Sequence, residues 1–554
     1  MNKKVCSFPI LFALLALLIG TCAVVFPASA QAAPTSTGSI TVSGTVASSY
    51  DAYQVFNANV VDGDSDAKIA TDLAWASDAV RDAALPVLHG AGMPNSQTTA
   101  QEAAEWLNTD SHLTSALSAQ LARSLQSSDA VSVALNAGTT AELPCGYWLI
   151  VADDDAIAQG EAGTAPIMAL VGGSAVTVKP KAATPKVAKH VLEDSTAAWQ
   201  KAADATVGDD LYWRLSATVP AGLTAYDTYT VRFVDTMSAG LDPSKVAASM
   251  RVYVAAGADG GFDAVSTGKD GRAGTEPAKG WTDITAQCRV SVDDKTFTVR
   301  TGDLIAALGG ADAFTAGARV VAVYNAPLNS ACNHGIAKGN PNEVYLRYPR
   351  SPFADQSGDA GFTRTPSDDA CAYTWDLALT KRGSDGDKPL AGAVLSIADD
   401  RGRTLAADGA WDAEGKATVT TGEDGRVTVS GVDSGKLEVR ELKAPKGYTA
   451  FEGTRSVTVK AEGLDVDQVA AAKPKLTITA ESPLRADSAD GSTGSLEASL
   501  INTPTGTPPS ITTGGFMPST GDMAMYAAAA AAVAGAALIV VALLVKRGGG
   551  SHKE

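Results

Sequence analysis

Residues 437–448 read LEVRELKAPKGY and lie in the C-terminal quarter of a 554-residue chain. Glu441 stands near the middle of this stretch. Residues 427–429 (VTV) have the composition of a short strand, and residues 423–425 (EDG) carry a turn signal just before it. Such short strands with turn residues between them predict an all-β domain, which we place at residues 371–505.

A lysine and an asparagine stand in the first and last strands expected of this domain. Lys381 ends residues 377–381 (LALTK), and Asn502 lies in residues 500–504 (LINTP). Burial disfavours the charged form of a side chain, so it lowers the pKa of a lysine and raises the pKa of a carboxyl. A neutral amine can then attack an amide carbonyl that a protonated carboxyl polarises, and ammonia leaves.

Together with residues 389–393 (PLAGA), these stretches resemble the Cna B-type module of Gram-positive surface proteins. In that family a lysine and an asparagine side chain join in an intramolecular isopeptide bond. The resemblance implies that Lys381 is the nucleophile, Asn502 the electrophile and Glu441 the proton shuttle. The alternative interpretation is a solvated pair of strand side chains, Lys381 and Glu441.

Residues 181–370 are richer in β-branched and aromatic residues, with Gly/Asp/Ala-rich loops between them, which predicts a β-sandwich with long surface loops. This region resembles the isopeptide-forming second domain of sortase-assembled fimbrial subunits. The matching stretches are residues 185–191, 207–209, 218–220, 226–229, 235–241 and 339–346. The resemblance implies a second crosslink between Lys189 and Asn342, with Asp235 as the acid. Lys186 and Asn340 remain the alternatives, because two lysines and two asparagines crowd these stretches.

Residues 33–180 predict an α+β domain. Residues 39–44 (SITVSG) alternate like a strand, and residues 146–151 (GYWLIV) return to that pattern. Between them, Thr99 and Glu102 have the spacing of a helix capping box. Four leucines recur at every fourth position, which predicts a helical stripe that faces the core rather than a partner: Leu113, Leu117, Leu121 and Leu125.

Residues 1–32 have the order of a secretory signal peptide. Two lysines precede an apolar run over residues 8–26, and Ala28-Ser29-Ala30 supplies the small residues of a cleavage site. A lipoprotein signal at Cys22 is the alternative, but the Ala-x-Ala site beyond it favours the ordinary signal peptidase.

A Pro/Thr/Gly-rich linker, residues 506–516, leads to the final segment, residues 517–554. The uncharged run over residues 523–545 is long enough to cross a bilayer as a transmembrane helix, and the Lys-Arg pair after it places the tail in the cytoplasm. With MPSTG just before the span, the segment resembles the LPXTG-type cell-wall sorting signal. This implies that a sortase cleaves between Thr520 and Gly521 and joins the Thr520 carboxyl to an amine. An ordinary single-pass anchor is the alternative.

Residues 176–181 (VTVKPK) stand at the boundary of the first two domains. They resemble the tail of the pilin motif WxxxVxVYPK, whose last lysine accepts the next subunit. Lys181 would be that acceptor, although Lys179 replaces the tyrosine of the motif and Gly172 its tryptophan. The alternative is a solvated Lys-Pro-Lys linker.

Composition excludes several other classes of function. The net charge of −17 disfavours nucleic-acid binding, because an acidic surface repels phosphates. The sequence has no zinc-ligand spacing, no nucleotide loop and no hydrolase elbow, so we expect no metal, no cofactor and no enzyme active site. Among the cysteines after the leader, Cys288 with Cys332 or Cys332 with Cys371 could form a disulfide outside the cell, and Cys145 could be an unpaired core thiol.

We therefore predict a mainly β chain: tandem Ig-like or Cna-type β-sandwich domains after an α+β N-terminal domain, with a C-terminal transmembrane helix. The resemblances imply the major subunit of a sortase-assembled, covalently polymerised pilus that is anchored to the cell wall and supports adhesion. Its partners would be sortases, further copies of itself, minor pilins, peptidoglycan and host surface ligands. The alternative function is a monomeric wall-anchored adhesin or a minor pilin.

Overall fold

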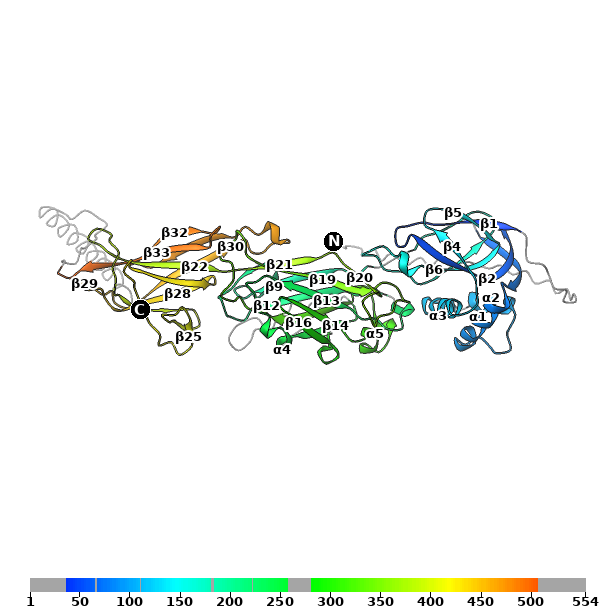
Figure 1. Cartoon of the computed structure of the whole chain (residues 1–554), viewed down its shortest axis with the longest axis horizontal. Helices are drawn as coiled ribbons and strands as arrows, with labels where there is room; N and C mark the ends of the chain where they lie inside the picture. Colours follow the sequence, from blue (N-terminus) through cyan, green and yellow to red (C-terminus); the bar gives the residue numbers. More distant parts are fainter. Residues whose placement is uncertain are drawn as a thin grey trace, which may run out of the picture.

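The computed structural model describes residues 36–64, 67–109, 111–180, 184–221, 223–257 and 280–506. Within these ranges the chain is mainly β, and it forms three domains arranged end to end along one long axis (Figure 1). The predicted signal peptide and the predicted membrane span over residues 523–545 lie outside the described residues. Inside the described ranges, no helix is both long and apolar enough to cross a membrane.

The N-terminal domain is α+β, as predicted, and its five-stranded sheet lies between three helices and a small second sheet. Strand β6 shows why: Leu149 and Val151 pack toward the helices, whereas Trp148 and Ile150 pack toward the small sheet. Its elements are β1 (Thr37–Val42), β2 (Ser49–Asp62), β3 (Lys68–Trp75), α1 (Asp78–Gly90), α2 (Ala100–Asn108), α3 (Ser115–Gln126), β4 (Ser132–Asn136), β5 (Thr140–Pro144), β6 (Gly146–Ala152), β7 (Ile167–Val171) and β8 (Val176–Val178).

Two helical predictions can be compared with these helices. Thr99 and Glu102 form the expected capping box at the start of α2. Leu117, Leu121 and Leu125 are buried along α3 and belong to the core, as predicted. Leu113 is an exception, because it precedes the helix and stays 36 % exposed.

The middle domain is a sandwich of a six-stranded and a seven-stranded sheet around one core. Strand β21 pairs with β19 and β11 of this domain, and the next strand begins at Trp375 in a different sheet. The elements are β9 (Val187–Glu193), β10 (Ala198–Gln200), β11 (Ala202–Asp204), β12 (Tyr212–Thr218), β13 (Arg232–Met237), α4 (Val246–Ser249), β14 (Arg251–Ala255), β15 (Thr282–Asp283), β16 (Arg289–Asp293), β17 (Thr296–Arg300), α5 (Leu304–Ala307), β18 (Arg319–Asn325), β19 (Asn340–Pro349), β20 (Phe362–Arg364) and β21 (Asp368–Tyr373).

The C-terminal domain is a second β-sandwich, with a five-stranded and a seven-stranded sheet. Its first and last strands, β22 and β33, are parallel neighbours, so the chain leaves this domain at the end far from the middle domain (Figure 1). The elements are β22 (Trp375–Gly383), β23 (Val394–Ala398), β24 (Thr404–Leu405), β25 (Trp411–Asp412), β26 (Val419–Thr420), β27 (Arg426–Val432), β28 (Gly435–Lys443), β29 (Tyr448–Thr449), β30 (Thr454–Glu462), β31 (Lys475–Ala480), β32 (Leu484–Asp490) and β33 (Ser495–Pro504).

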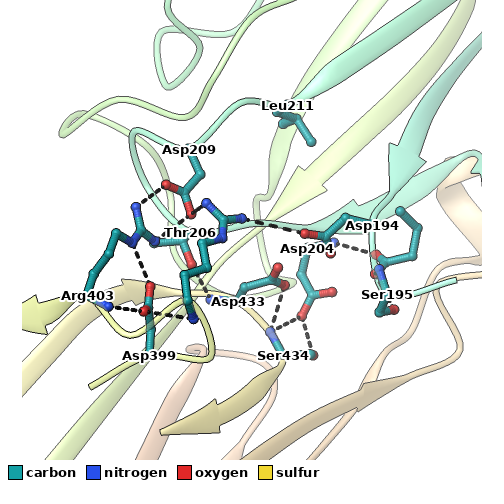
Figure 2. A network of polar contacts seen from close by, with 12 residues as sticks. Asp194, Ser195, Asp204, Thr206, Asp209, Leu211, Asp399, Arg403, Asp433 and Ser434 are labelled. Carbon is teal, nitrogen blue, oxygen red and sulfur yellow. Dashed lines mark hydrogen bonds and ion pairs between the residues drawn. The ribbon is translucent and has the colours of Figure 1, made fainter. Parts of the chain in front are cut away.

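A polar network joins the middle and C-terminal domains (Figure 2). The Arg403 guanidinium donates to both oxygens of Asp209, at 2.6 and 2.9 Å, and to Asp399. Asp204 accepts hydrogen bonds from the Trp375 indole and from Ser434. A paired arginine–carboxylate contact fixes orientation as well as distance, so this joint constrains the angle between the two domains.

Candidate functional site

The three residues singled out in the C-terminal domain occupy core-facing positions at the ends of their strands. Lys381 continues the buried face of β22 that includes Leu379, Glu441 continues that of β28, and Asn502 continues that of β33. Successive side chains of a strand point to opposite faces, so each of the three must enter the core. Strands β22 and β33 belong to one sheet and β28 to the other, so the cluster spans the sandwich.

The three side chains contact one another directly. Lys381 Nζ donates to Asn502 Oδ1 and lies 3.2 Å from Glu441 Oε1. Asn502 Nδ2 donates to both oxygens of Glu441, at 2.9 and 3.1 Å. The side chains of Lys381 and Glu441 are 0 % exposed, so the alternative of a solvated strand pair is wrong.

This geometry suits an attack of the amine on the amide. Burial lowers the pKa of Lys381 to about 8, although the nearby Glu441 opposes the shift, so a neutral amine is more accessible than on an exposed lysine. The amine contacts the carbonyl group of Asn502, and Glu441 contacts the nitrogen that would leave as ammonia. Nucleophile, electrophile and proton carrier are thus held together before any reaction.

The middle domain holds a second buried cluster of the same composition. Lys189 lies on β9 of the six-stranded sheet, whereas Asp235 on β13 and Asn342 on β19 belong to the opposite sheet. All three side chains are 0 % exposed. Strands β13 and β19 are antiparallel neighbours with Met237 opposite Asn342, which brings the acid and the amide to the same end of the sheet.

Lys189 Nζ donates to Asp235 Oδ2. Burial lowers the pKa of Lys189 to about 8, against the influence of Asp235, and burial raises the pKa of Asp235. Both shifts favour the neutral pair, in which the proton resides on the carboxyl. Asn342 Oδ1 and Asp235 Oδ1 are buried without a hydrogen-bond partner, which is a costly arrangement.

The two alternatives named for this cluster lie elsewhere. Lys186 is exposed and its backbone pairs with Thr218. Asn340 is buried, but its amide donates to the backbone oxygens of Asn333 and Ala372, so it holds a loop in place. The structure therefore brings Lys189, rather than Lys186, next to Asp235.

One residue of the middle cluster was missed in the sequence. Tyr324, on β18, is 0 % exposed, and its hydroxyl contacts Lys189, Asp235 and Asn342. The available signal was a hydroxyl-bearing aromatic residue at the end of the apolar run 320–323, because a buried tyrosine hydroxyl usually has a polar partner.

The remaining predicted residues of the assembly reaction are not described by the structure. Lys181 follows β8, the last strand of the N-terminal domain, and lies outside the described residues, as do Thr520 and Gly521. Their roles stay predictions from the sequence.

The predicted disulfides are wrong for this structure, because all four cysteines it describes are free thiols. Cys332 belongs to the apolar cluster of the middle domain, whereas Cys371, on β21, belongs to the cluster that continues into the C-terminal domain. The Cys288 thiol donates instead to the backbone oxygen of Ile284 at 3.3 Å. Cys145 is a buried unpaired thiol, as predicted.

Comparison with known proteins identifies relatives of parts of this chain. Residues 376–473 match the family model described as SpaA: Prealbumin-like fold domain. The chain is 30 % identical over 143 residues to the trypsin-resistant surface T6 protein of Streptococcus pyogenes serotype M6, which is 24 % of this chain and 24 % of that protein. The chain thus spans about a quarter of the length of the curated relative that it matches.

Two solved structures are similar over most of the chain, at low sequence identity. The T6 backbone pilin of serotype M6 Streptococcus pyogenes has 16 % identity and a TM-score of 0.45, covering 85 % of this chain and 98 % of that one. The full-length major pilin SpaD of Corynebacterium diphtheriae has 15 % identity and a TM-score of 0.40, covering 86 % and 100 %.

Proposed function

We propose that this chain is the major, backbone subunit of a covalently polymerised pilus on the surface of a Gram-positive cell. The observation that carries the proposal is the pair of buried Lys–acid–Asn clusters, one in each of two β-sandwich domains placed end to end. In each cluster the lysine and the asparagine join in an isopeptide bond, with Asp235 or Glu441 carrying the proton.

Each bond would tie together strands that are far apart in the sequence. Lys381 and Asn502 are 121 residues apart and lie on the first and last strands of their domain. A crosslink over so long a loop restricts the unfolded chain, much as a disulfide does. It also carries tension across the domain without loading its hydrogen bonds, which suits a fibre exposed to flow.

The proposed fibre is assembled by joining the C-terminal sorting signal of one copy to Lys181 of the next. A sortase cleaves between Thr520 and Gly521 and transfers the Thr520 acyl group to the Lys181 amine of another copy. Each transfer breaks one peptide bond and forms one amide, and its repetition gives an open head-to-tail fibre. Minor pilins, host ligands and a final transfer to peptidoglycan complete the proposed set of partners.

An immunoblot of detergent-boiled wall extracts tests the polymer. Cells with the wild-type chain should give a ladder of high-mass bands, and Lys181→Ala should reduce the ladder to a monomer. The matched control is Lys179→Ala, two residues away, which should keep the ladder. A ladder that survives in Lys181→Ala moves the acceptor elsewhere, and a single band in wild-type cells favours the anchored adhesin.

A further inference from the structure

The hydroxyl of Tyr324 lies between the three reactive groups of the middle domain. It accepts a hydrogen bond from Lys189 Nζ at 2.9 Å and one from Asn342 Nδ2 at 2.8 Å, and it donates to Asp235 Oδ2 at 3.1 Å. Edge-on packing against Phe297, with ring centroids 4.7 Å apart, fixes the ring. The hydroxyl is therefore held in one place and has no access to water.

The two clusters differ in how the acid reaches the asparagine. Glu441 touches the leaving nitrogen of Asn502 itself, at 2.9 and 3.1 Å. Asp235 has a side chain one methylene shorter, and within the described middle domain it makes no hydrogen bond to Asn342, whereas Tyr324 bonds to both. The tyrosine hydroxyl thus occupies the gap that the shorter acid leaves.

We propose that Tyr324 is a catalytic residue of the middle-domain isopeptide bond, whose hydroxyl relays a proton from Asp235 to the leaving nitrogen of Asn342. This inference rests on the bond between Lys189 and Asn342 in the proposed function. It assigns a fourth residue to a reaction for which the C-terminal cluster needs three.

The atoms and protons of the step balance. The neutral Lys189 amine forms a bond from Nζ to Cγ of Asn342. Asp235, protonated in the neutral pair, gives its proton to Tyr324 as Tyr324 passes its own proton to Asn342 Nδ2, and the free Asp235 Oδ2 then takes one proton from the attacking nitrogen, so both residues end as they began. The Cγ–Nδ2 bond breaks, and the products are one amide and one ammonia, with no oxidant or other co-reactant.

The test uses Tyr324→Phe in the full chain, because phenylalanine keeps the ring and removes only the hydroxyl. After a pulse of synthesis, intact mass and crosslinked peptides follow each bond through the loss of one ammonia. We expect the Lys189–Asn342 bond to form at least about a hundredfold more slowly, the lower end of what a general acid–base group contributes. The Lys381–Asn502 bond of the same molecule should form normally and thus reports folding. Tyr229→Phe, a buried tyrosine of the same core, is the matched control.

A second variant separates a relay from a structural role. Adding Asp235→Glu to Tyr324→Phe lengthens the acid so that it can reach Asn342 directly, as Glu441 reaches Asn502, and should restore most of the rate. No restoration, or a wild-type rate in Tyr324→Phe alone, overturns the relay. If Tyr324→Phe fails to fold, the chain can be made with ring-fluorinated tyrosine, which retains the hydroxyl at a lower pKa. This should change the rate of Lys189–Asn342 bond formation and leave the Lys381–Asn502 rate as it is. A Lys189–Asn342 rate equal to that of the unmodified chain would overturn the relay. A wild-type chain without the middle bond would instead refute that bond in the proposed function.

Discussion

Replacing Lys381 by methionine should remove the crosslink of the C-terminal domain without leaving an unreacted ammonium in the core. Methionine has an unbranched side chain of similar length, so it fills the space of the lysine stem. In the variant Asn502 retains its amide nitrogen, so Glu441 accepts hydrogen bonds from that nitrogen and from the backbone nitrogen of Phe451. The main loss is therefore the covalent restriction on the unfolded chain.

The separation of the two joined residues sets the size of this effect. For a loop of 121 residues the chain-entropy relation gives about 5 kcal/mol of stabilisation at 25 °C. For a domain of this size, a loss of that magnitude lowers the midpoint of thermal unfolding by about 20 °C.

Scanning calorimetry of the chain, with intact mass measured in parallel, checks this expectation. Lys381→Met should lack one ammonia loss, and its C-terminal transition should fall while that of the middle domain stays in place. Lys416→Met, at an exposed lysine of the same domain, is the control and should leave both transitions unchanged. If the crosslink is absent but the transition falls by less than a quarter of the expected shift, the entropic account is refuted.

Three further predictions concern pH, the domain joint and the thiols. The rate of Lys189–Asn342 bond formation should fall above pH 8, where the Lys189–Asp235 pair loses its shared proton. The rate should also fall in acid, where both groups are protonated. Time-resolved mass spectra check this, and a rate that keeps rising between pH 8 and 10 would contradict it. Gly431→Ala should loosen the contact between the middle and C-terminal domains, because the backbone has φ +69° there and a Cβ would lie 2.4 Å from Val207. X-ray scattering should show a wider range of molecular lengths for this variant than for Gly435→Ala, whose added Cβ meets no neighbour. Iodoacetamide should modify Cys288, Cys332 and Cys371 only after denaturation, since burial raises the pKa of each thiol to about 11. Mass spectrometry that finds any of the three in a disulfide would contradict the free-thiol structure.

Strand periodicity predicts which side chains of the two clusters point into the core. Lys381, Glu441 and Asn502 each continue a row of buried aliphatic residues, so alternation alone assigns them to the core. Alternation along β19 could not show whether Asn340 or Asn342 is the crosslinking asparagine, because the two are two positions apart on the same face of the strand and both are buried. Only the pairing of β19 with β13 decides which amide meets the acid.

Other features depend on contacts between segments that the sequence does not relate. Tyr324 lies 135 residues from Lys189, and nothing near either residue in the sequence records their contact. The disulfide predictions failed for the same reason, since oxidising surroundings permit a bond only where the fold brings two sulfurs together. The leucine spacing also did not show that Leu113 lies outside the helix, because Thr114 is the N-cap and α3 begins at Ser115.

The distribution of buried lysines along the chain fits the path that tension would take through the proposed fibre. If each subunit is joined through Lys181 at one end and Thr520 at the other, the load runs through the middle and C-terminal domains, and each of these holds a buried Lys–acid–Asn cluster. The N-terminal domain precedes Lys181 and lies off that path, and no lysine is buried among its described residues. The two proposed crosslinks thus lie in the two domains that would be pulled, whereas the N-terminal domain, which would bear no load, has no buried lysine among its described residues. Force spectroscopy can separate the two cases. Pulled from Lys181 to the C-terminal end, the chain should extend without unfolding either sandwich, whereas pulling from the N-terminal end should unfold the first domain at low force. Unfolding of the middle domain in the first geometry would contradict the assigned load path.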